Sequence, residues 1–144
     1  MQPKLQWYVK DDQALTPKKE HYAGSYAPEQ TMELEIRVWN NRFGTEPAGS
    51  IENPVLVFYF DTMEDSGLLK LCQASVDGGS FKEPDIIDKK AYMPLNRQVL
   101  KGEPNEGLDS DTDNYVDLNI SFDFSGAQLK PSDLKNLYLE IVSQ

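Results

Sequence analysis

The sequence predicts an all-β protein, an antiparallel β-sandwich of the immunoglobulin-like or jelly-roll type, with about seven or eight strands and an extended N-terminal arm. Apolar and polar residues alternate along most of the chain, which is the pattern of half-buried strands. No long segment repeats its apolar residues with the period of a helix. Clusters of Gly, Pro and Asn separate the alternating segments, as turns do between short strands. A small β-barrel is the alternative architecture.

Two segments alternate strictly and are predicted to be half-buried strands. In Thr31–Trp39 every second residue is apolar, and Glu or Arg fills the positions between them. In Tyr115–Phe124 Val, Leu, Ile and Phe alternate with Asp, Asn and Ser. One face of each strand should pack on the core and the other should meet water.

The middle of the chain predicts a central strand and a hairpin. Val55–Phe60 is apolar at every position, which favours a strand that is covered on both faces. Leu68–Val76 is the next expected strand, and Asp77-Gly78 after it is a tight-turn signal, because such turns need a positive φ. We expect the return strand to start at Ser80-Phe81.

Two more strands are expected towards the C-terminus. Ala91–Leu95 contains Pro94, which cannot donate to a ladder and places this strand at an edge or at an end. Lys130–Asp133 reads as a turn. Leu137–Val142 alternates again and should close the domain.

Residues 1–30 differ from the rest and are predicted to be an N-terminal arm on a single sandwich domain, 31–144. Alternation of Leu5, Trp7 and Val9 indicates one strand within residues 4–9 of the arm. The arm either packs on its own sandwich or is held by a neighbouring subunit. In the second case its aromatic residues would be the partner-binding anchors: Trp7, Tyr8, Tyr22 and Tyr26.

Charge and composition exclude several classes of partner. The chain has 144 residues with 14 basic and 24 acidic side chains, a formal charge of −10. A protein this acidic lacks the basic face that nucleic-acid phosphates or anionic lipids require. No apolar run reaches the length of a transmembrane helix, and the first 20 residues lack the apolar core of a signal peptide. We therefore expect synthesis in the cytoplasm without membrane insertion.

The pattern Asp109-x-Asp111-x-Asp113 is the candidate metal site. Acidic residues at this spacing match the first, third and fifth positions of an EF-hand calcium loop. The match then ends, because Asn114 replaces the glycine and Ile120 replaces the glutamate that this loop needs. The sequence leaves two interpretations open, a calcium loop of another type and a solvated acidic turn. No other cofactor is expected.

Residues with catalytic side chains form no pattern typical of an enzyme. Three acidic residues follow the predicted central strand: Asp61, Glu64 and Asp65. They are consistent with the paired carboxylates of a glycosidase and equally with an ordinary acidic loop. His21 is the only histidine, and no G-x-S-x-G nucleophile motif accompanies it. We predict that the protein is not an enzyme and has no catalytic residue.

Cys72 and Trp39 are expected to be core residues. Cys72 is the only cysteine, so the chain forms no internal disulfide, and a buried cysteine behaves as a small apolar residue. Trp39 ends a predicted strand and should pack inside. If exposed instead, its ring would stack on a sugar or anchor a protein partner.

Two segments resemble accessory structural proteins of tailed-phage virions. They are residues 35–60, EIRVWNNRFGTEPAGSIENPVLVFYF, and residues 114–142, NYVDLNISFDFSGAQLKPSDLKNLYLEIV. Proteins of this kind are small immunoglobulin-like or jelly-roll sandwiches that decorate a capsid or build tail and baseplate parts. The resemblance implies a structural protein located in the virion, whose partners are other virion proteins or copies of itself.

The same segments are similar to family 3 cellulose-binding modules. Val38-Trp39-Asn40, Phe58-Tyr59-Phe60 and Tyr138–Ile141 stand where that family has YWN-like, YYF-like and YLEI-like strands. This similarity implies a carbohydrate-binding module, assisted by calcium if the aspartate loop binds it. The planar aromatic strip of the family has no counterpart that we can place on the sequence, so no binding residue is transferred.

We therefore expect a non-enzymatic virion protein that docks on a protein lattice in the capsid, tail or baseplate. Carbohydrate binding is the alternative function. An adhesin-like or scaffold domain of a bacterial surface is the third.

Overall fold

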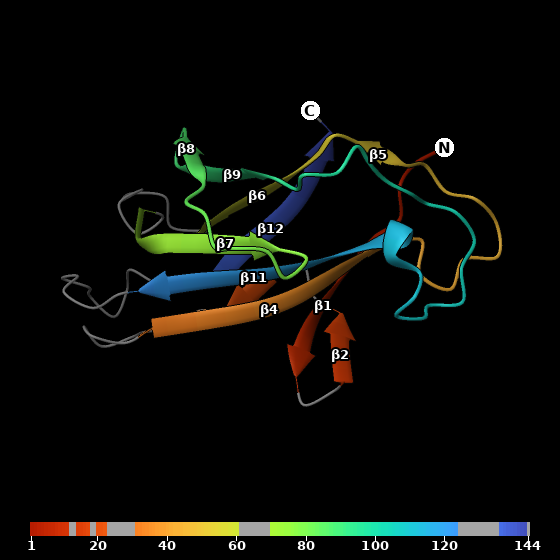
Figure 1. Cartoon of the computed structure of the whole chain (residues 1–144), viewed down its shortest axis with the longest axis horizontal. Coiled ribbons are helices and arrows are strands. Elements are labelled where there is room, and N and C mark those ends of the chain that lie inside the picture. The colour runs from red at the N-terminus through yellow and green to blue at the C-terminus, as the bar shows by residue number, and fades with distance from the viewer. Residues whose placement is uncertain (12–13, 18–19, 23–30, 61–69, 124–135, 144) are drawn as a thin grey trace.

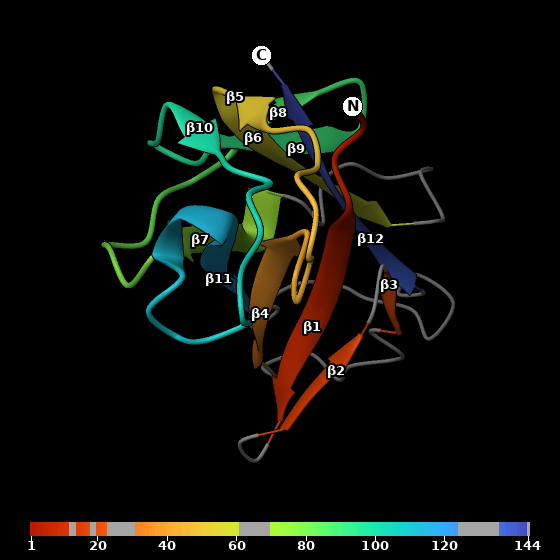
Figure 2. The ribbon, with the colours of Figure 1, turned by 90° about the vertical axis from the view of Figure 1, so that its right-hand side faces the viewer.

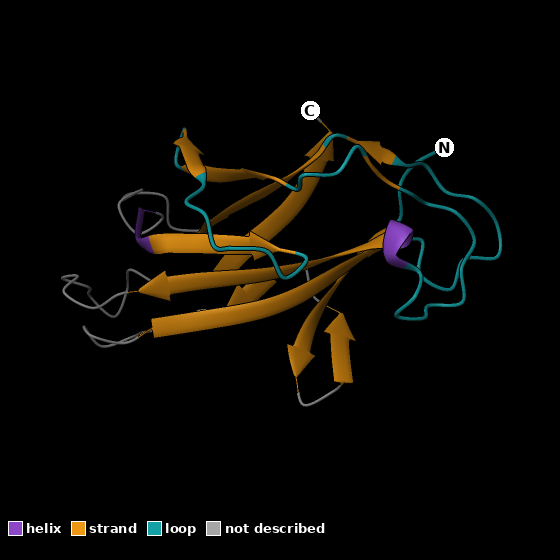
Figure 3. Cartoon of the chain, viewed as in Figure 1, coloured by secondary structure: helices purple, strands orange, loops and turns teal. Residues whose placement is uncertain are grey.

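The computed structural model describes residues 1–11, 14–17, 20–22, 31–60, 70–123 and 136–143 (Figure 1). They form two five-stranded antiparallel sheets, which confirms the predicted all-β sandwich (Figure 3). Sheet A has the order β2-β1-β4-β11-β7 and comprises β1 (Leu5–Asp11), β2 (Ala14–Pro17), β4 (Thr31–Asn40), β7 (Cys72–Val76) and β11 (Tyr115–Asp123). Sheet B has the order β3-β12-β6-β9-β8 and comprises β3 (Glu20–Tyr22), β6 (Pro54–Phe60), β8 (Asp85–Ile87), β9 (Lys90–Pro94) and β12 (Asn136–Ser143).

Short elements join the sheets at one end of the sandwich. The two-residue strands β5 (Ile51–Glu52) and β10 (Val99–Leu100) pair with each other, and the 3-10 turn η2 (Thr112–Asn114) leads into β11. Figure 2 turns the molecule so that β1 of sheet A and β12 of sheet B can be followed on one side. Among the described residues, no helix is long and apolar enough to cross a membrane.

The two sheets hold more strands than the seven or eight expected, because β2, β3 and β8 add to the predicted ones. β1 lies where alternation placed a strand and pairs with β4 from Leu5↔Asn40 to Val9↔Ile36. β2 then pairs with β1, and β3 pairs with β12 in the other sheet. The described part of residues 1–22 is thus built into the chain's own sandwich, which is the first of the two alternatives that the sequence left open for the arm. Residues 23–30 lie outside the described residues.

Side chains that alternate along the strands fill the space between the sheets. Sheet A contributes the inner residues of β4, β7 and β11 together with Trp7, and sheet B contributes those of β6, β9 and β12. The rings of Phe58 and Phe122 meet edge to face across this core at 6.4 Å between centroids. β6 occupies the middle of sheet B, and its outward residues Val55 and Val57 are also buried, as predicted for a strand covered on both faces.

The turn chemistry also matches the sequence. Asp77 and Gly78 both have positive φ, at 50° and 76°, and the Gly79 amide closes the turn on the Val76 carbonyl at 2.9 Å. The return segment makes a single bridge, Ala74↔Lys82, instead of a full strand. Pro94 ends β9, as expected of a residue without an amide hydrogen.

Buried asparagines hold the long loops that follow β4 and β10. The Asn41 amide donates to the carbonyls of Glu46 at 2.8 Å and Gly102 at 2.9 Å. The Asn40 amide donates to the Gly49 carbonyl at 2.8 Å. The asparagine side chains therefore fix these loops to the sheet. They also give the loop carbonyls hydrogen-bond partners, and a buried backbone group without a partner would cost free energy. The chain that leads to Ser50 is positioned in this way.

We predict that Phe122→Ala lowers the free energy of unfolding by about 3–5 kcal/mol, because it leaves a cavity beside Phe58. Equilibrium unfolding in urea measures this. Phe81→Ala, at a ring that is 41% exposed, is the control and should cost less than about 0.5 kcal/mol. Equal losses for the two variants would contradict this account of the core.

Candidate functional site

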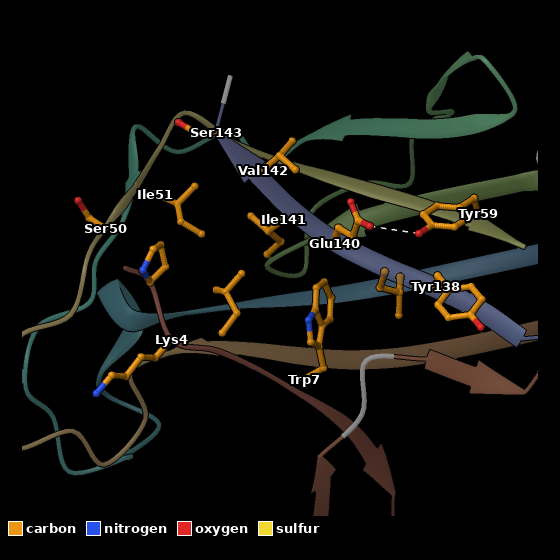
Figure 4. Close-up of a pocket in the computed structure, with 13 residues that line it drawn as sticks. Lys4, Trp7, Ser50, Ile51, Tyr59, Tyr138, Glu140, Ile141, Val142 and Ser143 are labelled. Carbon is orange, nitrogen blue, oxygen red and sulfur yellow. Dashed lines mark hydrogen bonds between the residues drawn. The ribbon is translucent and has the colours of Figure 1, made fainter. Parts of the chain in front are cut away.

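A groove of about 760 Å³ lies between the edge of β1 in sheet A and the edge of β12 in sheet B (Figure 4). Four segments build it: the start of β1, the start of β5 with the residue before it, Tyr59 of β6, and β12. The lining residues are Pro3, Lys4, Leu5, Trp7, Ser50, Ile51, Tyr59 and Tyr138–Ser143.

The groove is open because the strands next to β1 and β12 are short. β2 pairs with β1 only over Tyr8–Asp11, and β3 pairs with β12 only over Asn136–Tyr138. Among the described residues, no strand pairs with Leu5–Trp7 or with Leu139–Ser143 on this side. Two lengths of sheet edge therefore face one hollow.

The inner wall of the groove is apolar. Trp7, Ile51, Leu139 and Ile141 line it, and all four belong to the main core cluster. Figure 4 shows the Trp7 ring pointing from β1 towards β12. The wall therefore offers contact to apolar side chains, which gain free energy when they leave water.

Charge is confined to the rim. Lys4 and Glu140 are both exposed, and one Glu140 carboxylate oxygen accepts a hydrogen bond from the Tyr59 hydroxyl at 3.1 Å. The described lining holds one carboxylate and no histidine or cysteine. Such a lining supplies apolar contacts along the wall and hydrogen-bonding groups at the rim.

The outer face of sheet B carries a second feature, a tyrosine face made of Tyr59, Tyr92 and Tyr138. Tyr59 and Tyr138 oppose each other in the β6–β12 register and their rings stack at 5.5 Å with an interplanar angle of 21°. The Lys90 ammonium lies 4.6 Å from the centre of the Tyr59 ring. Burial, followed by the hydrogen bond to Glu140, raises the pKa of Tyr59 above its usual range. All three rings are half-buried.

The predicted metal residue Asp109 is held by an arginine instead. Arg37 on β4 places two nitrogens on the Asp117 carboxylate at 2.6 and 3.0 Å and a third on Asp109 at 2.7 Å. Its guanidinium also lies 4.0 Å from the centre of the Tyr115 ring. These hydrogen bonds, that to Asp117 first, raise the pKa of Arg37. The acidic loop is thereby tied to the outer face of sheet A.

The other two aspartates of the loop point to different partners. Asp111 accepts a hydrogen bond from the Leu108 amide at 2.9 Å, and Asp113 lies 3.9 Å from the Lys101 ammonium. Within the described residues, no three acidic, histidine or cysteine side chains gather where they could share a metal ion. The spacing that suggested calcium thus does not bring Asp109, Asp111 and Asp113 together.

Burial changes the interpretation of the N-terminal aromatic residues. Trp7 is 4% exposed and Tyr8 is 8% exposed, because β1 is a strand of sheet A. A ring that inserts into a neighbouring molecule must protrude from its own fold, so this packing corrects the anchor role given to Trp7 and Tyr8. Trp7 keeps only the small exposed part of its ring that lines the groove. Tyr22 belongs to β3, of which the backbone pairing is described, and Tyr26 lies outside the described residues.

Trp39 and Cys72 are buried, as predicted. Trp39 packs with Tyr8 and Tyr115 in a small cluster on the outer face of sheet A, and its centroid lies 4.7 Å from that of Tyr115. Cys72 is a core residue of β7. Burial raises the pKa of the Cys72 thiol to about 12, which keeps the thiol protonated and unreactive at neutral pH.

The remaining catalytic candidates receive no support from the described residues. Asp61, Glu64 and Asp65 lie outside them. His21 pairs with Leu137 through the β3 backbone, and nothing further is described of its side chain.

The sequence interpretation missed both the groove and the tyrosine face. The groove depends on where β2 and β3 stop, which alternation does not reveal. The tyrosine face had a weak signal, because Tyr59 and Tyr138 each interrupt an apolar strand with a polar-tipped ring.

Comparison with known proteins adds no assignment: neither the models of known families nor the curated proteins contain a match to this chain.

We predict that Arg37→Gln lowers the free energy of unfolding by about 1–2 kcal/mol, because Asp117 and Asp109 lose their hydrogen bonds to a charged donor. The loss stays this small because both carboxylates are exposed to water, which weakens the ion pairs. Thermal and urea unfolding measure this. Lys82→Gln, at an exposed side chain, is the control and should have almost no effect. An Arg37 variant as stable as the wild type would show that the loop is held by other contacts.

Proposed function

We propose that this protein is a non-enzymatic structural protein that docks on another protein, as an accessory component of a tailed-phage virion in the capsid, tail or baseplate. The observation that carries the docking part is the apolar groove between two lengths of sheet edge that none of the described strands covers. The resemblance of residues 35–60 and 114–142 to accessory virion proteins supports the location in a virion.

The groove favours a protein partner because of its chemistry. An uncovered sheet edge is a template for pairing, and soluble proteins usually protect such edges with charges, bulges or covering loops. Here the wall behind the edges carries Trp7, Leu139 and Ile141, and the charges of Lys4 and Glu140 stay at the rim. Apolar side chains and backbone amides of a partner match this combination.

Net charge supports the same function. A formal charge of −10 keeps free copies apart before assembly. It also favours a partner surface with basic residues, because complementary charge speeds association. A lattice of another protein can provide such a surface at every repeat.

The test is a variant that fills the groove without changing the core. Ser50 is exposed and lines the groove, so Ser50→Trp should place a ring in it. We predict that particles from a phage deleted for this gene and complemented with Ser50→Trp contain about tenfold less of the protein than with wild type. Quantitative mass spectrometry of purified particles measures the copy number.

Ser80→Trp is the matched control, since Ser80 is an exposed serine on the far turn and should leave incorporation unchanged. Wild-type protein absent from purified particles would contradict the virion location. Normal incorporation of Ser50→Trp would contradict docking through the groove.

A specific observation favours carbohydrate binding as the second candidate. Tyr59, Tyr92 and Tyr138 lie on one outer face of a sheet, and the stacked pair provides ring surface on which sugars stack. The similarity to family 3 cellulose-binding modules points to the same ligand class, although the strip of that family was not placed on the sequence.

Depletion of the protein from solution by cellulose, chitin and bacterial cell-wall polysaccharide tests this candidate, with calcium and with chelator. If the tyrosine face binds, Tyr92→Ala should weaken binding by about tenfold, whereas Phe43→Ala, at an exposed ring elsewhere, should not. Absence of depletion by all three polymers would remove this candidate.

A further inference from the structure

We infer that the groove receives an extended segment of the partner polypeptide, which adds as a further strand to the uncovered edge of β12. This inference rests on the proposed function, because it names how the partner occupies the proposed docking groove.

The backbone of β12 presents hydrogen-bonding groups to the groove. The Pro54 carbonyl accepts from the Leu95 amide at 3.0 Å, so the backbone polar groups of Pro54 face β9. Direction alternates from residue to residue along a strand, and two paired residues of neighbouring antiparallel strands point their backbone groups either both towards each other or both away from each other. Through the β6–β12 register, Glu140 then faces β6, whereas Leu139 and Ile141 direct their amides and carbonyls to the uncovered edge. Among the described residues, no strand accepts them there.

β1 provides a second edge across the groove. The Lys4 carbonyl accepts from the Asn41 amide at 2.8 Å, so Lys4 faces β4. By the same alternation, Leu5 and Trp7 direct their backbone polar groups away from β4. An extended segment that pairs with β12 would therefore also lie near the backbone groups of β1 across the groove. Two rows of backbone groups suit a polypeptide better than a compact small molecule.

The uncovered edge has a defined length. At one end it begins after Tyr138, where pairing with β3 stops. At the other end the Ser143 hydroxyl donates to the Glu52 carbonyl at 2.7 Å and ties β12 to β5. The interval Leu139–Val142 spans about 14 Å at roughly 3.4 Å per residue, so it fits a guest strand of about four or five residues.

Side-chain positions specify the guest. Residues of a guest strand alternate between the two faces of sheet B, as the neighbours on β12 do. Inward residues would contact Trp7, Ile51 and Ile141, so they should be apolar. Outward residues would lie beside Glu140, so they should be polar, and a basic residue is favoured there.

A second copy of this chain is a poorer guest than a different protein. Pairing of β12 with β12 of another copy would bring together two molecules that each carry a formal charge of −10. Like charge opposes such contact. The guest is therefore an alternating apolar and basic segment of a partner protein.

The experiment selects guests from a display library of random nine-residue peptides on the immobilised full-length protein. We expect enriched sequences with an apolar residue at every second position. Their synthetic forms should bind Ile141→Pro about tenfold more weakly than wild type, because this variant loses the outward amide. The matched control is Ile86→Pro on β8. By the same alternation, Ile86 directs its amide outward at the opposite edge of sheet B, so this variant also loses an outward amide. It should bind the peptides as the wild type does.

Amide hydrogen exchange on the wild-type protein gives a readout that does not depend on how the proline variants fold. A bound peptide should slow exchange at Leu139 and Ile141 by about tenfold or more and leave Glu140, which already faces β6, almost unchanged. No enrichment, or enriched peptides that leave these two amides unprotected, would overturn strand addition.

The outcomes separate this inference from the proposed function. If a peptide protects the Leu139 and Ile141 amides but the protein is absent from particles, the inference of strand addition is supported and the virion location is contradicted. Loss of incorporation by Ser50→Trp without any peptide that protects the edge would keep groove docking and remove strand addition.

Discussion

The pairing of β4 with β11 is the interaction on which the rest of the structure depends. It runs over nine residue pairs, from Thr31↔Asp123 to Tyr115↔Trp39. One face of the pair supplies inner core residues, and the other carries Arg37, which ties the acidic loop to the sheet. A shift of one residue would exchange these faces and expose the core, so the register fixes the fold and the loops together.

The proposed docking groove lies at one side of the sandwich, where an edge of sheet A and an edge of sheet B are only partly paired. β1 and β12 each have a full partner on one side and a short one on the other. Core residues stand behind both edges, since Trp7, Leu139 and Ile141 belong to the main core cluster. An edge that is already part of a sheet loses little conformational entropy on binding, which favours affinity from a small contact.

The sequence predicted the sandwich and most central strands because alternation directly records which face of a strand is buried. It predicted the turn at Asp77-Gly78 for a local reason, since few residues tolerate positive φ. It did not predict how Asp109, Asp111 and Asp113 separate, because the position of Arg37 depends on pairing over long range. The sequence left the place of Trp7 and Tyr8 open, because the alternation of Leu5, Trp7 and Val9 indicates a strand but not whether its own sandwich or a neighbour holds that strand. The groove depends on where β2 and β3 end relative to β1 and β12, and no single segment of the sequence encodes that.

The place of β12 in chain order has a consequence for the timing of assembly. Among the described strands β12 comes last in chain order, yet it lies between β3 and β6 and pairs with segments more than half the chain away. Contacts of such long sequence separation form late and slowly. The edge that we infer to be the binding edge therefore forms late in folding. If the proposed docking is correct, chains that have not completed sheet B lack the docking edge, and folding itself would select the copies that can bind.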